Sequence, residues 1–181
     1  MSQRRRNRSL VAVALLIVSL VAIANATGIR INVSDSVARG LWITTPRAAT
    51  VGAYVLICPP PTALFGAARE RGYLPRGHCP GGFAPLMKQV VAIEGDQVDI
   101  GADGMRVNGR LLPRSAPRQR DGAGRALVAW PAGAFNVAAG EVVLYGSGTP
   151  YSFDARYFGP LPRELIRSVI EPVLLVDRMT P

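Results

Sequence analysis

The hydrophobic and polar positions divide the chain into one uncharged N-terminal segment and a series of short apolar runs. Residues 9–29 carry no charged side chain. Beyond them, apolar runs alternate with clusters rich in Gly, Pro, Asn, Asp and Ser, a pattern typical of short strands joined by turns. The predicted strands cover residues 41–43, 54–57, 86–93, 97–100, 126–130, 141–145 and 173–176.

Turn signals separate several of these runs. Three consecutive prolines at 59–61 end the run at 54–57, because proline cannot donate a hydrogen bond to a strand ladder. The pair Asn108-Gly109 predicts a tight hairpin. Residues 163–167 are expected to form a helical turn near the C-terminus.

One further segment is predicted to be helical. Thr62 is suited to begin a short helix as its N-cap, and Gly72 is suited to end it. This helix falls between Cys58 and Cys79, so we expect an insertion whose base is held by the two cysteines and which lies outside the core sheet.

Composition limits the fold class. A chain of 181 residues with 49% hydrophobic and 18% charged residues is neither disordered nor collagen-like, and it fits one domain. Its 19 Gly and 15 Pro disfavour a long helical bundle. We therefore predict an all-β, mainly antiparallel domain over residues 30–181, with the short helical insertion, preceded by an N-terminal segment at 1–29.

The N-terminal segment predicts export. Its 21 uncharged residues would span about 30 Å as a helix, the thickness of the hydrocarbon core of a bilayer. Arg4, Arg5, Arg6 and Arg8 precede it, which predicts a cytoplasmic N-terminus and a body outside the cytoplasm. Small-x-small sites at 22–26 also fit a cleaved signal peptide, so a retained inner-membrane anchor and a cleaved signal both remain open.

Charge gives little support for a nucleic-acid partner. The net charge is +9, but four arginines belong to the N-terminal topology signal, and residues 9–181 carry 17 basic against 12 acidic side chains. We expect no nucleic-acid partner. The Arg-rich stretch at 113–125 is expected to be a solvated loop, with a basic docking patch as the alternative. A DNA-transfer accessory role, resting on Arg106 to Arg125, is a further alternative.

The two cysteines are expected to form one disulfide. An even count in an exported chain favours a bond between Cys58 and Cys79, and closing a loop of about 21 residues would stabilise the fold by about 3 kcal/mol. His78 adjoins Cys79, which raises a zinc site as the alternative, but a fourth ligand is missing. We expect no metal.

The single lysine is the first candidate for chemistry. Twenty of the 21 basic residues are Arg, and Lys88 is the exception. Unlike arginine, a buried lysine can lose its proton and act as a general base. In an extended strand Lys88 shares a face with Leu86, Val90 and Ala92, which would desolvate its amine. The alternative is a lysine at a strand edge that extends its amine into solvent.

Three motifs follow one another along the chain. They are residues 34–42 (Ser-Asp-Ser-Val-Ala-Arg-Gly-Leu-Trp), residues 85–96, in which Lys88 heads an apolar strand that a Gly-Asp turn closes, and residues 151–160 (Tyr-Ser-Phe-Asp-Ala-Arg-Tyr-Phe-Gly-Pro). In this order they resemble the nucleophile motif, the lysine motif and the last motif of the type I signal peptidases, and most closely those of the TraF-like conjugal-transfer members. The resemblance covers nearly the whole exported region and implies a signal-peptidase-like β fold.

The resemblance implies roles for individual residues. Ser36 would be the nucleophile, Lys88 its general base, and Ser152 the residue that holds the lysine amine; an ordinary turn serine is the alternative for Ser152. The backbone N–H of Ser36 would stabilise the oxyanion, helped by the hydroxyl of Ser34. Ser34 could equally stabilise its own turn.

Other matched residues are expected to support the site. Asp154 and Arg156 would form an ion pair at its floor. The chain departs from the family pattern at Ala38, Ala53 and Glu94, which changes turn rigidity and leaves an inactive homologue open.

The resemblance implies a serine endopeptidase with a Ser/Lys dyad, anchored in the bacterial inner membrane or free in the periplasm. It would remove a leader or pro-segment from an exported protein such as a conjugative pro-pilin, and it would need no cofactor. The alternatives are a housekeeping signal peptidase and a non-catalytic scaffold of a conjugation or secretion apparatus.

Overall fold

Antiparallel strands form the body of the molecule. A computed structural model describes residues 3–176, and within this range the strands form two sheets. The larger sheet has the order β1-β2-β12-β3-β5-β10-β11. Its strands are β1 (Ile29–Asn32), β2 (Gly40–Thr45), β3 (Tyr54–Ile57), β5 (Leu86–Ile93), β10 (Glu141–Tyr145), β11 (Leu161–Pro162) and β12 (Ile166–Leu175).

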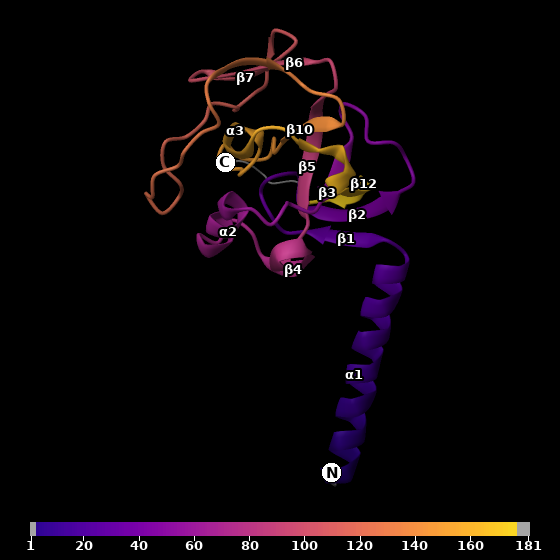
Figure 1. Cartoon of the computed structure of the whole chain (residues 1–181). Helices are drawn as coiled ribbons and strands as arrows, with labels where there is room; N and C mark the ends of the chain where they lie inside the picture. The colour runs from indigo at the N-terminus through magenta and orange to yellow at the C-terminus, as the bar shows by residue number, and fades with distance from the viewer. Residues whose placement is uncertain (1–2, 177–181) are drawn as a thin grey trace.

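The smaller sheet has the order β8-β7-β6-β9. Its strands are β6 (Gln97–Gly101), β7 (Gly104–Val107), β8 (Arg110–Leu111) and β9 (Gly133–Asn136). The predicted Asn-Gly hairpin joins β7 to β8, with positive φ values of 50° at Asn108 and 79° at Gly109. Figure 1 shows β6 and β7 at the end of the body opposite to α1 (Gln3–Ala26).

Helices are short except for α1. The others are α2 (Ala63–Glu70), α3 (Ala155–Phe158) and two 3-10 turns, η1 (Pro80–Gly82) and η2 (Arg163–Leu165). Helix α2 begins after Thr62 and is followed by Gly72 at a φ of 80°, as the sequence predicts, although the Thr62 side chain makes no capping hydrogen bond. The helical turn expected near the C-terminus is η2.

Helix α1 covers most of the predicted N-terminal segment. Figure 1 shows it extending away from the β body. In the described part of the chain, no helix combines the length and apolar character that a membrane crossing needs. The membrane crossing therefore stays a prediction.

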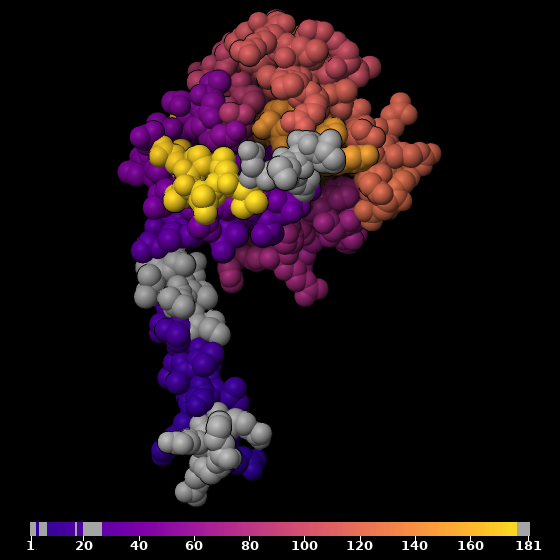
Figure 2. Space-filling model, turned by 180° about the vertical axis from the view of Figure 1, so that it is seen from behind, coloured from indigo at the N-terminus to yellow at the C-terminus, as the bar shows by residue number. Residues whose placement is uncertain are grey.

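Long-range pairing brings the C-terminal strand β12 into the larger sheet. Strand β12 lies between β2 and β3, pairing Ile170 with Thr44 on one side and with Tyr54 on the other. Figure 2 shows this C-terminal strand, in yellow, against the violet N-terminal strands. Strand β5 is an interior strand of the same sheet and lies between β3 and β10.

Several predicted strands agree with the structure, and one is wrong. Strands β3, β5 and β10 have the predicted bounds. The run at 126–130 forms no strand, because its backbone follows a surface loop in which Val128 is 84% exposed and Ala126 makes only an isolated bridge to Arg120. Strand β9 follows this loop instead.

The insertion between the cysteines is held as predicted. A disulfide joins Cys58 to Cys79, which leaves no thiolate for the zinc alternative. Strand β4 (Arg76–Cys79) of the insertion joins neither sheet. Helix α2 nevertheless contributes to the core, because Phe65 is buried against Phe153 and Phe158.

Candidate active site

Lys88 is buried in the middle of the larger sheet. It lies on β5 opposite Val55 of β3, and its exposed fraction is 2%. On the same strand Val90 and Ala92 are fully buried. The alternative of a lysine extending into solvent from a strand edge is therefore wrong, because β5 is not an edge strand and the side chain is enclosed.

The amine of Lys88 has one neutral partner. Its Nζ donates a hydrogen bond of 2.8 Å to Oγ of Ser152. The pKa of Lys88 is lowered to about 8, mainly by desolvation; the charge of Asp154 opposes this shift and the charge of Arg156 adds to it. A substantial fraction of the amine is therefore neutral slightly above neutral pH, as a general base requires.

Asn32 organises the loop that carries Ser36. This loop connects β1 to β2, and the buried Asn32 side chain lies at its start. Its Nδ2 donates to the carbonyl oxygens of Ser34, Val37 and Ala38 at 2.9–3.1 Å. One amide thus holds both sides of the turn around Ser36. Asn32 was not among the predicted site residues, although an Asn before a polar turn commonly forms hydrogen bonds with nearby backbone groups.

Ser34 belongs to the same turn. Its backbone N–H and its hydroxyl both donate to Oδ1 of Asn32, at 3.0 and 2.8 Å. A serine hydroxyl has one proton to donate. In this arrangement the proton of Ser34 is directed to Asn32 and not toward an oxyanion, so the structure gives Ser34 the turn-stabilising contact that was the alternative.

Two glycines after β10 allow the close approach of three segments. The N–H of Gly148 donates to the carbonyl oxygen of Ser36 at 3.0 Å. A Cβ on Gly148 would lie 2.2 Å from the carbonyl oxygen of Asp35, and one on Gly146 would lie 2.0 Å from Oγ of Ser152. Neither position can accept a side chain without displacing Ser36 or Ser152. In the sequence, this close approach is indicated only by the Gly-x-Gly of residues 146–148, directly after an apolar strand.

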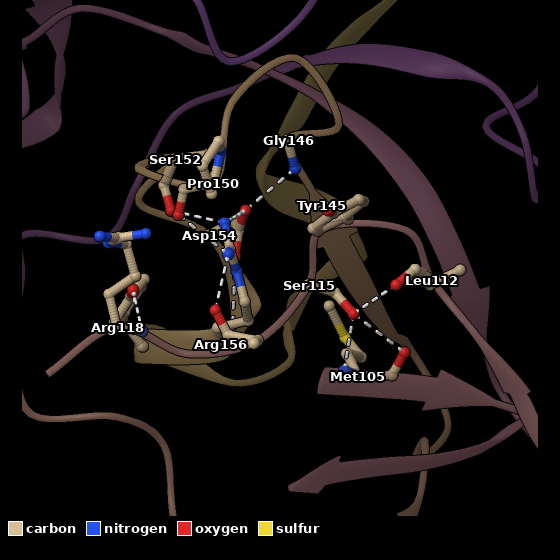
Figure 3. A network of polar contacts seen from close by, with 12 residues as sticks. Met105, Leu112, Ser115, Arg118, Tyr145, Gly146, Pro150, Ser152, Asp154 and Arg156 are labelled. Carbon is tan, nitrogen blue, oxygen red and sulfur yellow. Dashed lines mark hydrogen bonds and ion pairs between the residues drawn. The ribbon is translucent and has the colours of Figure 1, made fainter. Parts of the chain in front are cut away.

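The predicted ion pair is present and fully buried. Asp154 and Arg156 have an exposed fraction of 0%, with Nε of Arg156 2.7 Å from Oδ1 of Asp154. The guanidinium also donates to the carbonyl oxygen of Ser152 at 2.9 Å, and Oδ2 of Asp154 accepts from the N–H of Gly146 at 3.0 Å. Figure 3 shows this network, in which the pair holds the backbone of the serine that contacts Lys88.

Two cavities meet at Ser36 and Lys88, which line both. One, of about 290 Å³, is largely apolar and aromatic, with Leu86, Tyr151 and Phe153 in its wall. The other, of about 620 Å³, runs along β1 toward the disulfide. Among the described residues no hydrogen bond joins Oγ of Ser36 to Nζ of Lys88; the Lys88 amine bonds Ser152, and both Ser36 and Lys88 line the two cavities.

Comparison with known proteins identifies the family. Residues 4–174 match the family model described as signal peptidase, peptidase S26. The chain belongs to this family. It is 44% identical over 149 residues to a plasmid transfer protein TraF of Escherichia coli, covering 82% of this chain and 84% of that protein. It is 39% identical over 175 residues to the conjugal transfer protein TraF of Agrobacterium tumefaciens strain 15955, covering 96% and 97%.

Among solved structures, the chain is similar to a signal peptidase I from Enterococcus faecalis V583. The TM-score is 0.40 at 15% sequence identity, and the match covers 69% of this chain and 98% of the other.

In this member of the S26 family, the insertion reaches over the apolar cavity. The hydroxyl of Tyr73, in the insertion, donates a hydrogen bond to the carboxylate of Asp121 in the Arg-rich loop. Arg125 forms an ion pair with the same carboxylate. The Tyr73 hydroxyl and nearby N–H donors hold the pKa of Asp121 far below its usual range. Tyr73 and Asp121 both line the cavity that contains Ser36, so contacts between two distant loops complete its wall.

Proposed function

We propose that the chain is a serine endopeptidase in which Ser36 is the nucleophile and Lys88 the general base. The observation that carries the proposal is the Lys88 amine, which is enclosed, bonded to the neutral Ser152 and adjacent to a cavity that Ser36 also lines. A scaffold has no use for such an amine, because burying an ammonium without a carboxylate in direct contact is costly. Family membership supports the same reaction class.

The proposed mechanism transfers one proton and one acyl group. Neutral Lys88 takes the proton of Ser36 as Oγ attacks the scissile carbonyl, and returns it to the departing amine. Water, or an amine of the substrate, then releases the acyl group. The backbone N–H of Ser36 has no hydrogen-bond acceptor among the described residues, so it is available to the oxyanion.

We further propose that the substrate is an exported pro-protein of a conjugation apparatus, such as a pro-pilin. The support is similarity to proteins named TraF, two of which are named conjugal transfer proteins and a third a probable conjugal transfer protein. Export itself rests on the uncharged segment at residues 9–29. Ser36 lies soon after that segment, which would put the cleavage site near the outer surface of the inner membrane.

The test is processing of a co-expressed pro-pilin from a neighbouring gene, followed by mass spectrometry of the product. We expect Ser36→Ala, Lys88→Arg and Lys88→Met to stop processing while the proteins remain folded by circular dichroism. Arginine keeps its proton over the accessible pH range, so it cannot act as the base. Full processing by Lys88→Arg would contradict the dyad, and processing by every variant would favour the scaffold alternative.

A further inference from the structure

A basic groove lies beside the candidate active site. Its volume is about 490 Å³, and three arginines line it together with Pro150. These are Arg114, Arg118 and Arg120 of the Arg-rich loop, and all three are exposed. None of the described residues that line the groove is acidic.

The three guanidinium groups have no carboxylate partner within residues 3–176. Arg114 donates to the carbonyl oxygen of Ser147, and Arg120 donates to that of Gly124. Elsewhere in the described chain, exposed arginines that do form ion pairs are Arg39, Arg47, Arg106 and Arg125. Asp121, which follows Arg120 in sequence, is engaged with Tyr73 and Arg125. Most N–H donors of the groove therefore remain available to an external anion.

The groove is joined rigidly to the candidate site. The guanidinium of the buried Arg156, which bonds the carbonyl oxygen of Ser152, also bonds those of Pro150, Arg114 and Ala116 at 3.1–3.4 Å. One side chain thus fixes the floor of the groove and the serine that contacts Lys88. Figure 3 shows Pro150 and Ser152 side by side above Arg156.

Tyr151 connects the groove to the cavity that contains Ser36. The guanidinium carbon of Arg118 lies 4.2 Å from the centre of the Tyr151 ring, and Tyr151 lines that cavity. A peptide with its scissile bond at Ser36 would therefore meet the arginines a short distance along its chain.

We propose that this groove binds carboxylate side chains of the substrate close to the scissile bond, so that Arg118 and Arg120 determine specificity for an acidic segment. This rests on the proposed function. Guanidinium groups match carboxylates in geometry and charge, and unpaired arginines at the mouth of a site attract an acidic peptide. A peptide is favoured over a nucleic acid because Tyr151, which Arg118 contacts, lines a cavity suited to apolar side chains.

The test measures binding and cleavage separately. Binding uses the full chain with Ser36→Ala in detergent micelles and fluorescein-labelled, alanine-rich peptides. Each peptide carries Glu-Glu or Gln-Gln, on either side of the cleavage site. We expect one Glu-Glu peptide to bind about three- to tenfold more tightly than its Gln-Gln counterpart, and the advantage to shrink in high salt.

Single substitutions inside and outside the groove test whether its arginines cause the preference for Glu-Glu peptides. Arg118→Ala and Arg120→Ala should each reduce the preference for Glu-Glu, while Arg118→Lys should retain most of it. Arg110→Ala removes the same charge from β8, outside the groove lining, and should leave the preference intact. Equal affinities for Glu-Glu and Gln-Gln peptides would overturn the proposal. So would a preference that both alanine variants retain, or single-stranded DNA that displaces the Glu-Glu peptide at lower concentration than unlabelled peptide does.

Cleavage by the enzyme with Ser36 intact distinguishes the two proposals. The expected result is a lower KM for the Glu-Glu peptide with kcat little changed, lost in Arg120→Ala. If no peptide is cleaved but the Glu-Glu preference in binding persists, the peptidase proposal fails and the groove stands. If cleavage depends on Ser36 but is equal for both peptides, the groove proposal fails and the peptidase stands.

Discussion

Burial of the Lys88 amine predicts that peptide cleavage accelerates as the pH rises from 7 to 9. With a pKa of about 8, roughly 10% of the amine is neutral at pH 7 and roughly 90% at pH 9. Because only the neutral amine accepts the proton of Ser36, kcat/KM should rise about tenfold over this interval and then level off.

The same burial predicts how stability depends on pH. The pKa of Lys88 is about 8 in the folded chain and 10.5 in the unfolded chain. Between these pH values the unfolded state binds more protons than the folded state, so the free energy of unfolding rises with pH. The contribution of Lys88 to this free energy is complete above pH 10.5 and is lost as the pH falls toward 8. The whole difference is about 3 kcal/mol, and about 2 kcal/mol of it falls between pH 7 and 9.5.

The assay compares wild type with Lys88→Met. Urea unfolding at pH 7 and 9.5 should show that wild type gains about 2 kcal/mol relative to the variant at the higher pH, because methionine has no proton to lose. Arg110→Met is the control and should follow wild type. A rate profile still rising with unit slope at pH 10, or parallel pH dependence of stability in wild type and Lys88→Met, would refute the reasoning.

Two further predictions concern the segments around the site. Gly148→Ala should reduce kcat/KM for cleavage by at least tenfold, because the new Cβ would lie 2.2 Å from the carbonyl oxygen of Asp35. The control is Gly66→Ala on α2, where a Cβ meets nothing within 4 Å and cleavage should be unchanged. A wild-type kcat/KM in Gly148→Ala would count against this prediction. Replacing Cys58 and Cys79 by serine should lower the free energy of unfolding by about 3 kcal/mol in urea, and a thiol reagent that labels the unreduced exported protein at either cysteine would contradict the disulfide.

Local patterns in the sequence predicted the central strands and the residue types of the site. The run at 86–93 forms β5 with its predicted bounds, and the alternation around Lys88 correctly indicated an apolar face. The Asn-Gly pair, the short helix after Thr62 and the Cys58–Cys79 bond also follow the sequence. The turn and the helix depend on neighbouring residues, whose spacing and turn chemistry act over a few positions, whereas the disulfide prediction rested on the even cysteine count.

Periodicity alone could not show how the segments meet. Apolar content at 126–130 suggested a strand, but a strand needs a partner with free hydrogen-bonding groups, and that loop is on the surface. Strand β12 takes its place between β2 and β3 only because the chain folds back over its whole length.

The sequence by itself therefore determined the family and the identity of Ser36, Lys88 and Ser152 as candidates, and it predicted export. Only the tertiary structure decided that Lys88 is enclosed and that Asn32 and Gly148 hold the loop of Ser36, and it shows the predicted contact between Lys88 and Ser152. The physical reason is that desolvation and hydrogen bonding depend on which atoms surround a group, and those atoms come from segments far apart in the chain.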